Sequence, residues 1–282
     1  MSNFNQLSLK LELNEILGDR KLENRPKIVA GNWKMHANLK DSQALIEDVG
    51  RFAKADANCK VIIIPPFTHI FPLSLIVEKN HYPLVMGAQN MYYEDKGAYT
   101  GEISPLMLVD LDIKYVLIGH SERRQLFNES NQIVNRKLQK ALSHNLTPIL
   151  CVGESLDERE AGLTDQVVKR QIVASLSTID RESLANKFIV AYEPVWAIGT
   201  GQVCQANEAN RVINLIRFTL SQHFKTKDND TLFGDSIPIL YGGSVKGSNA
   251  KELAVQPDID GALVGGSSLI APDFCEIIKA FS

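Results

Sequence analysis

Short runs of apolar residues alternate along the chain with longer amphipathic stretches that carry most of the charge. The apolar runs are continuous and rich in Val and Ile, which is typical of strands that are buried on both faces. We predict strands at Lys27–Gly31, Lys60–Pro65, Leu84–Ala88, Tyr115–Gly119, Pro148–Val152, Phe188–Tyr192, Pro238–Tyr241 and Gly261–Val264. A helical stretch follows each strand, and examples are Asn131–Ser143, Thr164–Thr178, Ala206–Phe224 and Ser267–Phe281. This alternation indicates parallel strand–helix–strand units.

Eight such units fit a closed (β/α)₈ barrel, although a doubly wound open sheet also accommodates the pattern. The barrel is favoured because polar and glycine-rich groups gather directly after the strands. These groups are Asn32–Lys34, His120–Arg124, Glu193–Gly201, Gly242–Ser244 and Gly265–Ser268. In a barrel such positions share one rim, where active sites are built, whereas an open sheet would spread them along an edge. We therefore predict a single α/β barrel domain over residues 27–282.

Residues 1–26 precede the first predicted strand. They hold Leu7, Leu9, Leu11 and Leu17 among charged residues, a partly helical pattern without candidate chemistry. We predict a short N-terminal extension that either packs as a helix against the barrel or stays loose. It lacks the basic head and apolar stretch of a secretory signal, and its acidic residues argue against a transit peptide.

Composition and charge argue against several classes of function. The chain of 282 residues is 44% hydrophobic with a formal net charge of −3, so nothing predicts a nucleic-acid-binding face or a basic membrane anchor. No apolar run has the length of a membrane span. The four cysteines are widely spaced without a CxxC pair, which favours free thiols in a reducing cytoplasm. The six histidines are scattered, and we predict neither a metal site nor a cofactor.

The first candidate chemical group, Asn32 and Lys34, follows the first strand. At a catalytic rim, Lys34 could hold an anionic substrate and Asn32 could donate a hydrogen bond to a developing oxyanion. A solvated lysine is the alternative for Lys34.

His120 follows the fourth strand, and the residues after it resemble the first turn of a helix. A helix N-terminus disfavours the imidazolium, so a neutral ring would donate one N–H, polarise a carbonyl and shuttle protons. A histidine that is satisfied in a polar loop is the alternative. Glu122 either positions Lys34 or pairs with Arg123 or Arg124.

Glu193 follows the sixth strand and precedes Pro194, which restricts the backbone before it. The segment up to Gly201 combines the bulky Trp196 with a flexible Gly-Thr-Gly end, which predicts a lid with hinges. A carboxylate beneath a lid loses water and gains basicity, as abstraction of a carbon-bound proton requires. A buried structural loop is the alternative, and it leaves Glu193 unexplained.

Two glycine-rich turns, Gly242–Ser244 and Gly265–Ser267, follow the last two strands. Such turns can aim backbone N–H groups at a phosphate, helped by a short helix N-terminus. One glycine pair alone would be weak support, but two at neighbouring strand ends predict a phosphate site.

Seven motifs along the chain resemble those of triosephosphate isomerases. They are GNWKM at 31–35, GAQNMYYEDKGAYTGEIS at 87–104, GHSERR at 119–124, CVGESLDEREAG at 151–162, YEPVWAIGTG at 192–201, YGGSV at 241–245 and LVGGSSL at 263–269. The resemblance runs from about Lys27 to the C-terminus, in the family's order and spacing. It implies a TIM barrel and the interconversion of D-glyceraldehyde 3-phosphate and dihydroxyacetone phosphate through an enediolate, in glycolysis and gluconeogenesis.

The resemblance also implies residue roles. Glu193 resembles the base that moves a proton between two carbons, His120 the neutral electrophile, and Glu122 the acidic partner of the active-site lysine. Residues 194–201 resemble the closing lid. The substrate and phosphate groups implied are Asn32, Lys34, Gly199, Ser244, Gly265 and Gly266.

A homodimer is implied as well, because residues 89–102 resemble a loop that docks into a neighbouring subunit. Gln89, Thr100 and Glu102 are the predicted interface residues, and Thr100 would lie near the partner's Asn32 and the partner's Glu122. The extension departs from the family, whose chains begin almost at the first strand. It leaves open an added contact to the barrel, to the dimer or to another protein.

Two other functions are compatible with such a barrel. One is a phosphate-binding aldolase or lyase that uses Lys34 as a Schiff base, which requires a neutral amine. The other is an inactive barrel kept for binding or scaffolding. It predicts that one of the motifs around Lys34, His120 or Glu193 has lost its catalytic residue. All three residues stand within intact motifs.

Overall fold

The computed structural model describes residues 25–199, 202–225 and 233–282. Its strands are β1 (Ile28–Asn32), β2 (Lys60–Ile64), β3 (Leu84–Ala88), β4 (Tyr115–Ile118), β5 (Thr147–Val152), β6 (Ile189–Tyr192), β7 (Ile239–Tyr241) and β8 (Gly261–Val264). They form a closed parallel barrel in chain order, and β8 returns to pair with β1, with Ile28 opposite Gly261. The predicted (β/α)₈ barrel is confirmed, and all eight strands lie within a residue or two of their predicted bounds.

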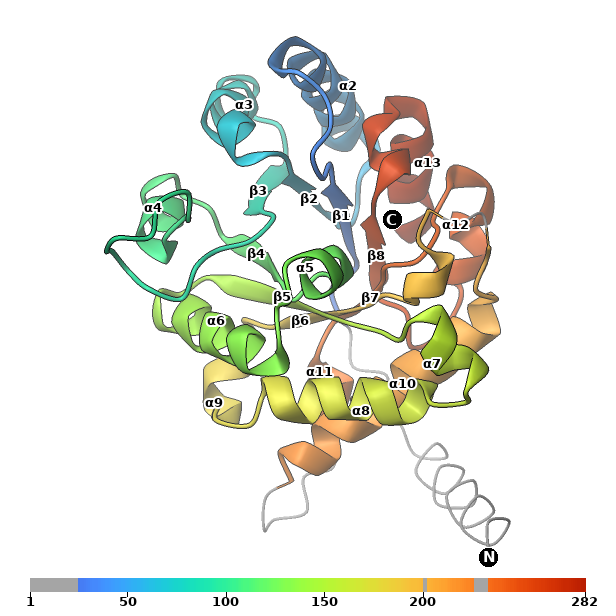
Figure 1. The fold of residues 1–282 in the computed structure, drawn as a ribbon. Helices are drawn as coiled ribbons and strands as arrows, with labels where there is room; N and C mark the ends of the chain where they lie inside the picture. The colour runs from blue at the N-terminus through green and yellow to red at the C-terminus, as the bar shows by residue number, and fades with distance from the viewer. Residues whose placement is uncertain (1–24, 200–201, 226–232) are drawn as a thin grey trace, which may run out of the picture.

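Helices surround the barrel and leave the strand ends free for loops (Figure 1). They are α2 (Leu39–Asp56), α3 (Phe67–Asn80), α4 (Pro105–Asp110), α5 (Ser121–Leu126), α6 (Asn131–Ser143), α7 (Leu156–Glu160), α8 (Thr164–Ser175), α9 (Arg181–Leu184), α10 (Ala206–His223), α11 (Phe233–Ser236), α12 (Gly247–Ala254) and α13 (Ala271–Phe281), with 3₁₀ turns η1 (Val195–Ala197) and η2 (Gly266–Leu269). Side-chain caps begin several of them; the Ser130 hydroxyl, for example, accepts a hydrogen bond from the Ile133 N–H.

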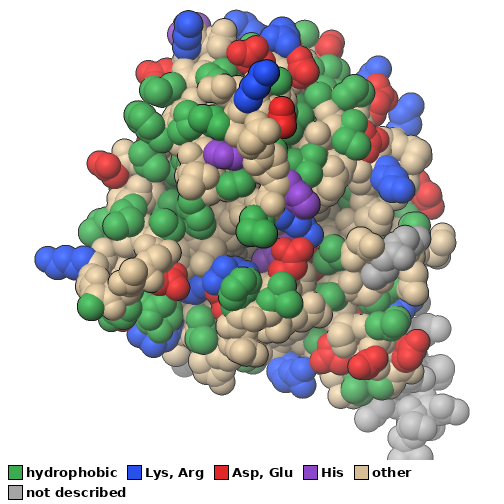
Figure 2. Space-filling view, turned by 45° about the horizontal axis from the view of Figure 1, so that its top comes forward, with side chains coloured by type: hydrophobic (Ala, Val, Ile, Leu, Met, Phe, Trp, Pro, Cys, Tyr) green, Lys and Arg blue, Asp and Glu red, His purple; other side chains and the backbone are tan. Residues whose placement is uncertain are grey.

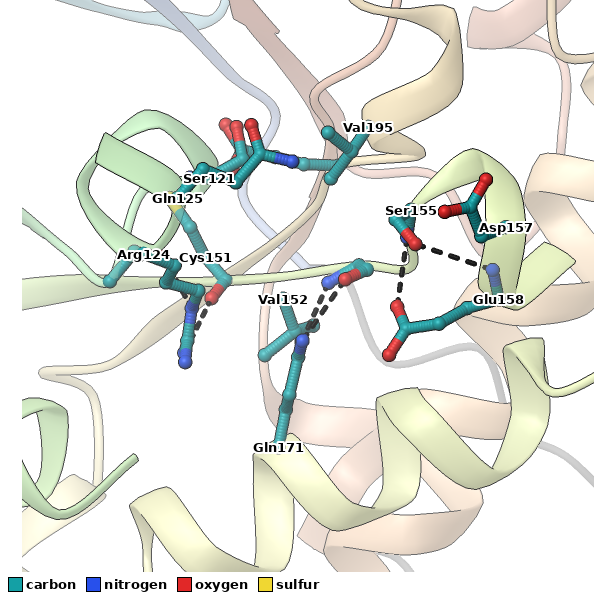
Figure 3. Close-up of a pocket in the computed structure, with 13 residues that line it drawn as sticks. Ser121, Arg124, Gln125, Cys151, Val152, Ser155, Asp157, Glu158, Gln171 and Val195 are labelled. Carbon is teal, nitrogen blue, oxygen red and sulfur yellow. Dashed lines mark hydrogen bonds between the residues drawn. The ribbon is translucent and has the colours of Figure 1, made fainter. Parts of the chain in front are cut away.

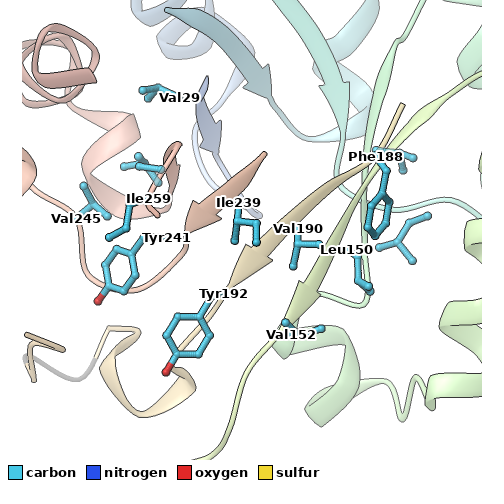
Figure 4. Packing of buried hydrophobic residues seen from close by; sticks show 14 of the residues in the cluster. Val29, Leu150, Val152, Phe188, Val190, Tyr192, Ile239, Tyr241, Val245 and Ile259 are labelled. Carbon is cyan, nitrogen blue, oxygen red and sulfur yellow. The ribbon is translucent and has the colours of Figure 1, made fainter. Parts of the chain in front are cut away.

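Two apolar layers hold these elements together. Alternate strand residues such as Ile28 and Ala30 fill the inside of the barrel, while Val29 between them faces the helices. Figure 4 shows part of the outer layer, in which Val190 and Ile239 pack outside the strands. Both faces of each strand are therefore buried, which explains why the strands read as continuous apolar runs.

The predicted helix Ser267–Phe281 is wrong as a single element. It divides into η2 and α13, with Ile270 in an extended conformation between them. Pro272 lies in the first turn of α13, where its ring and its missing N–H are tolerated only because the helix starts there. The predicted helix Thr164–Thr178 also ends early, at Ser175.

Arg25 fastens the beginning of the described chain to the base of the barrel. Its guanidinium donates to the Asp260 carboxylate at 2.7 Å and to the Pro257 carbonyl at 2.8 Å. Most of the predicted extension, residues 1–24, lies outside the described residues. No helix in the described ranges is both long enough and apolar enough to cross a membrane.

Candidate active site

Asn32 and Lys34 stand at the end of β1. The Lys34 backbone adopts a φ of +52°, a left-handed conformation that is strained for a lysine. Its N–H donates to the Asn32 side-chain oxygen at 3.1 Å, which helps to hold this turn. The strained turn places the lysine side chain at the rim, where it is only 22% exposed.

The Lys34 ammonium donates to the Glu122 carboxylate at 2.5 Å. Of the three partners considered for Glu122, which are Lys34, Arg123 and Arg124, the structure shows the lysine. The neighbouring Arg123 instead pairs with the buried Glu129 at 2.5 Å, and Arg124 donates to the backbone carbonyl of Gly119 at 2.7 Å. Glu122 therefore fixes the position of the positive charge at the rim.

His120 caps the N-terminus of α5 and is buried. The backbone N–H of Glu122 donates to Nδ1 of its ring at 3.3 Å, so the opposite nitrogen, Nε2, points into the site. Nε2 lies 3.0 Å from the Glu193 carboxylate. A ring whose Nδ1 accepts and whose Nε2 donates is a neutral imidazole.

Opposing influences act on the pKa of His120. Burial lowers it, but the adjacent Glu193 carboxylate raises it, and these two influences together place the pKa above its ordinary value. Protonation of Nδ1 would however cost the hydrogen bond from the Glu122 N–H, because an imidazolium has no acceptor nitrogen. That contact, together with the N-terminus of α5, favours the neutral ring.

Glu193 lies directly after β6, and 2% of its surface is exposed. One carboxylate oxygen faces His120, and the other accepts the Ser121 N–H at 2.9 Å. Burial by itself raises the pKa of Glu193, but His120 and the Ser121 N–H outweigh it, so that the pKa falls below its usual range. The two contacts hold the side chain in place, and both favour its ionised form.

A cavity of about 220 Å³ opens over these groups. Its lining includes Asn32, Lys34, His120, Glu193, Gly199, Ser244, Gly265 and Gly266. Gly265 lies beside Lys34, because a Cβ placed on it would be 3.5 Å from the lysine Cε. The structure therefore brings the predicted acid–base groups, the lysine and the glycine turns together around one cavity, with Glu122 behind the lysine. In a space-filling view, histidine, basic and acidic side chains lie together near the middle of one face (Figure 2).

Comparison with known proteins agrees with this arrangement. The sequence model of the family described as triosephosphate isomerase matches residues 27–281. A triosephosphate isomerase of Clostridium tetani is 50% identical over 255 residues, which cover 90% of this chain and 96% of the relative. One from Thermoanaerobacter pseudethanolicus is 47% identical (90% and 99% covered), and one from Dictyoglomus turgidum is 43% identical (91% and 100% covered).

The chain belongs to the triosephosphate isomerase family. As an isomerase of this family, it interconverts two triose phosphates. An aldolase or lyase is thereby set aside as the main activity.

The lid predicted from the triosephosphate isomerase motifs is described as far as Gly199, and residues 200–201 lie outside the described residues. Its indole anchor, Trp196, donates to the Glu154 carboxylate at 2.8 Å. Tyr192 donates to the same carboxylate at 3.2 Å, and the Arg159 guanidinium lies over the indole ring at 4.0 Å. In this arrangement the start of the lid is therefore fastened to the loop that follows β5.

Glu154, which anchors the start of the lid through Trp196, is the residue that sequence reasoning missed. It lies within the CVGESLDEREAG motif, but no role was inferred for it. It is fully buried, and burial raises its pKa above the usual value despite the donors around it. The signal that could have found it is its position, because it follows the end of β5 as Glu193 follows β6.

The predicted interface residues of this isomerase face in different directions. Thr100 and Glu102 are exposed on the long loop after β3. Gln89 instead turns inward, and its side-chain amide donates to the Lys34 carbonyl at 2.7 Å. Gln89 thus supports the Lys34 turn within the same chain.

No cluster of three or more His, Cys, Asp or Glu side chains in the described parts of the chain is arranged to hold a metal ion.

Proposed function

We propose that Glu193 and His120 perform the proton transfers of the triose phosphate interconversion in glycolysis and gluconeogenesis. The observation that carries this proposal is that the Glu193 carboxylate and the His120 Nε2 nitrogen lie 3.0 Å apart, beside Lys34 in one small cavity. A base, a hydrogen-bond donor and a fixed cation are what an enediolate needs.

In the ketose-to-aldose direction, Glu193 removes a proton from C1 of dihydroxyacetone phosphate. The electron pair of the broken C–H bond forms the C1–C2 double bond, and the carbonyl oxygen becomes the enediolate oxygen. His120 donates its N–H to this oxygen and moves a proton between the two oxygens. Glu193 then returns its proton to C2, which gives D-glyceraldehyde 3-phosphate. Every proton stays within the substrate and these side chains, so the reaction requires no cofactor.

The Lys34 ammonium and Asn32 would stabilise the negative charge that develops on the oxygens. The turns at Gly265–Gly266 and Ser244, together with Gly199 of the lid, would hold the phosphate through backbone N–H groups. Glu193 must turn from the Ser121 N–H toward the substrate to act. Closure of residues 194–201 would exclude water from the base and from the intermediate.

We also propose a homodimer in the cytoplasm. Large apolar side chains stay exposed on the segments that follow β1, β3 and β4, at one rim of the parallel barrel. They include Met35 (94% exposed), Tyr99 (42%), Leu126 (70%) and Phe127 (61%). Exposed apolar side chains at one rim of the barrel support a subunit interface there. The four free cysteines agree with a reducing compartment.

A coupled assay for conversion of D-glyceraldehyde 3-phosphate to dihydroxyacetone phosphate tests the reaction. We expect turnover that needs no added metal and persists in a chelator. Absence of turnover from the folded protein would contradict the proposal and favour a barrel that only binds its ligand.

A further inference from the structure

Gln171, on α8, binds both peptide groups of Gly153 at the end of β5. The Gly153 N–H donates to the side-chain oxygen of Gln171 at 2.8 Å, and the Gln171 amide donates back to the Gly153 carbonyl at 3.0 Å. Figure 3 shows Gln171 reaching from its helix to the strand end with both bonds drawn. A side-chain amide that satisfies the donor and the acceptor of one residue fixes the orientation of that residue's backbone.

The backbone of Glu193 rests directly on Gly153. A Cβ placed on Gly153 would lie 1.7 Å from the Glu193 carbonyl oxygen, so no side chain fits between them. The residues on either side of Gly153 continue the sheet pairing past the strand ends. The Glu193 N–H donates to the Val152 carbonyl at 2.7 Å, and the Val195 N–H donates to the Glu154 carbonyl at 3.0 Å.

We propose that Gln171 is a positioning residue for Glu193 and, through Val195, for the start of the lid. Glycine is the most flexible residue type, so the Gly153 backbone on which Glu193 rests needs an external support. Gln171 supplies this support from α8 through its two hydrogen bonds to Gly153. The proposal rests on the role proposed above for Glu193.

The cavity beside this contact explains why the support matters. A space of about 380 Å³ is lined by Gly153, Ser155, Gln171 and Glu193 among others. Without the amide of Gln171, the Gly153 peptide groups would bind water in this space, and the backbone could shift by a fraction of an ångström. Proton transfer is sensitive to such shifts, since a misplacement of about 1 Å can cost about 10²-fold in rate.

A purely structural role predicts a different result. If Gln171 only ties α8 to the barrel, its loss would lower stability and leave kcat unchanged. A matched comparison is provided by Asn135, a buried amide on α6 that donates to the Ser175 carbonyl at the end of α8 at 2.8 Å. It is a similar helix-to-backbone contact, away from Glu193.

The experiment compares Gln171→Met with Asn135→Leu in the full chain, by steady-state kinetics and urea unfolding. For Gln171→Met we expect kcat to fall at least about tenfold, while KM and competitive inhibition by inorganic phosphate stay within about twofold. Asn135→Leu should lose stability and keep its kcat. An unchanged kcat in Gln171→Met, or an equal fall in both variants, would overturn the proposal.

Two further variants complete the test. Gln171→Asn withdraws the amide by one methylene, and it should reduce kcat in the same way as Gln171→Met. It serves as the test if Gln171→Met does not fold, and a normal kcat in Gln171→Asn would then refute the proposal. Glu193→Gln separates the two proposals. If it keeps full turnover, the base is wrong and the positioning role falls with it. If it is inactive while the Gln171 variants are normal, only the positioning role is refuted.

Discussion

Shortening the proposed base by one methylene, Glu193→Asp, tests how far catalysis depends on the position of this carboxylate. The substitution keeps the charge and withdraws it by about 1.5 Å, the length of one C–C bond. In the structure the carboxylate lies 2.9 Å from the Ser121 N–H and 3.0 Å from His120 Nε2. A retreat of that size breaks both contacts, because hydrogen bonds extend little beyond 3.2 Å.

The expected loss follows from the same geometry. A misplacement of about 1 Å costs about 10²-fold, and each tenfold step corresponds to about 1.4 kcal/mol of activation free energy. We therefore expect kcat of Glu193→Asp to fall about 10²-fold, or about 2.7 kcal/mol. KM should change little, because Lys34 and the glycine turns proposed to bind the phosphate are untouched.

The assay is steady-state kinetics in both directions, with inorganic phosphate as a competitive inhibitor. Urea unfolding serves as the control, since removal of one buried methylene should cost only about 1 kcal/mol of stability. A kcat within about threefold of the parent would refute the argument that this carboxylate must contact the substrate directly. A large rise in KM or in the phosphate inhibition constant would instead indicate a disturbed cavity.

Three other predictions concern regions outside the base. Asp260→Ala should lower the free energy of unfolding by about 3 kcal/mol, the low end for a broken buried ion pair, because the fully buried Arg217 loses its 2.5 Å partner but keeps Asp258 at 3.2 Å. Urea unfolding at fixed protein concentration measures this loss. Met35→Glu should convert the proposed dimer to monomers, because it replaces an apolar side chain that is 94% exposed, and that the proposed interface would cover, with a charged one. Analytical ultracentrifugation measures the change. Burial raises the pKa of Cys275 to about 11 and of Cys204 to about 12, so both are protonated at pH 8. Thiol labelling there should be at least about tenfold slower than for free cysteine and should accelerate as the pH rises.

Matched variants keep these predictions refutable. Asp48→Ala breaks only an exposed ion pair with Arg51 and should cost less than about 1 kcal/mol. If Asp48→Ala lowers the free energy of unfolding as much as Asp260→Ala does, then burial does not explain the contribution of the Asp260–Arg217 pair to stability. Val255→Glu changes a side chain that is 76% exposed at the end of α12 and should leave the oligomeric state unchanged. A parent chain that is monomeric would contradict the prediction for Met35→Glu. A Cys204 or Cys275 thiol that reacts at pH 8 as fast as free cysteine would contradict the prediction of slow labelling.

The barrel could be predicted from the sequence because its signals are local. Each strand is a short apolar run, and its bounds agree with the structure to within a residue or two. The break in the last helix was also a local signal, since Pro272 disfavours a helix that continues through it, and the prediction gave it too little importance.

The candidate site was predictable in its membership and only partly in its contacts. Chemical residues directly after strands must meet at one rim of a parallel barrel, which brings Lys34, His120 and Glu193 together. The choice of Lys34 as the partner of Glu122 needed the folded chain, because two arginines stand beside that carboxylate in the sequence. The inward turn of Gln89 was likewise hidden from the sequence.

The sequence by itself determined where the strands lie, favoured a closed barrel over an open sheet and indicated the residues that surround its cavity, because apolar periodicity and strand-end position are properties of short segments. The tertiary structure alone decided which donors meet the base, why Glu154 is buried under Trp196, and how Gln171 supports Gly153. Those contacts join residues 18 to 72 positions apart. Distances of that kind are set by how helices pack on the barrel, and no local pattern of residues encodes them.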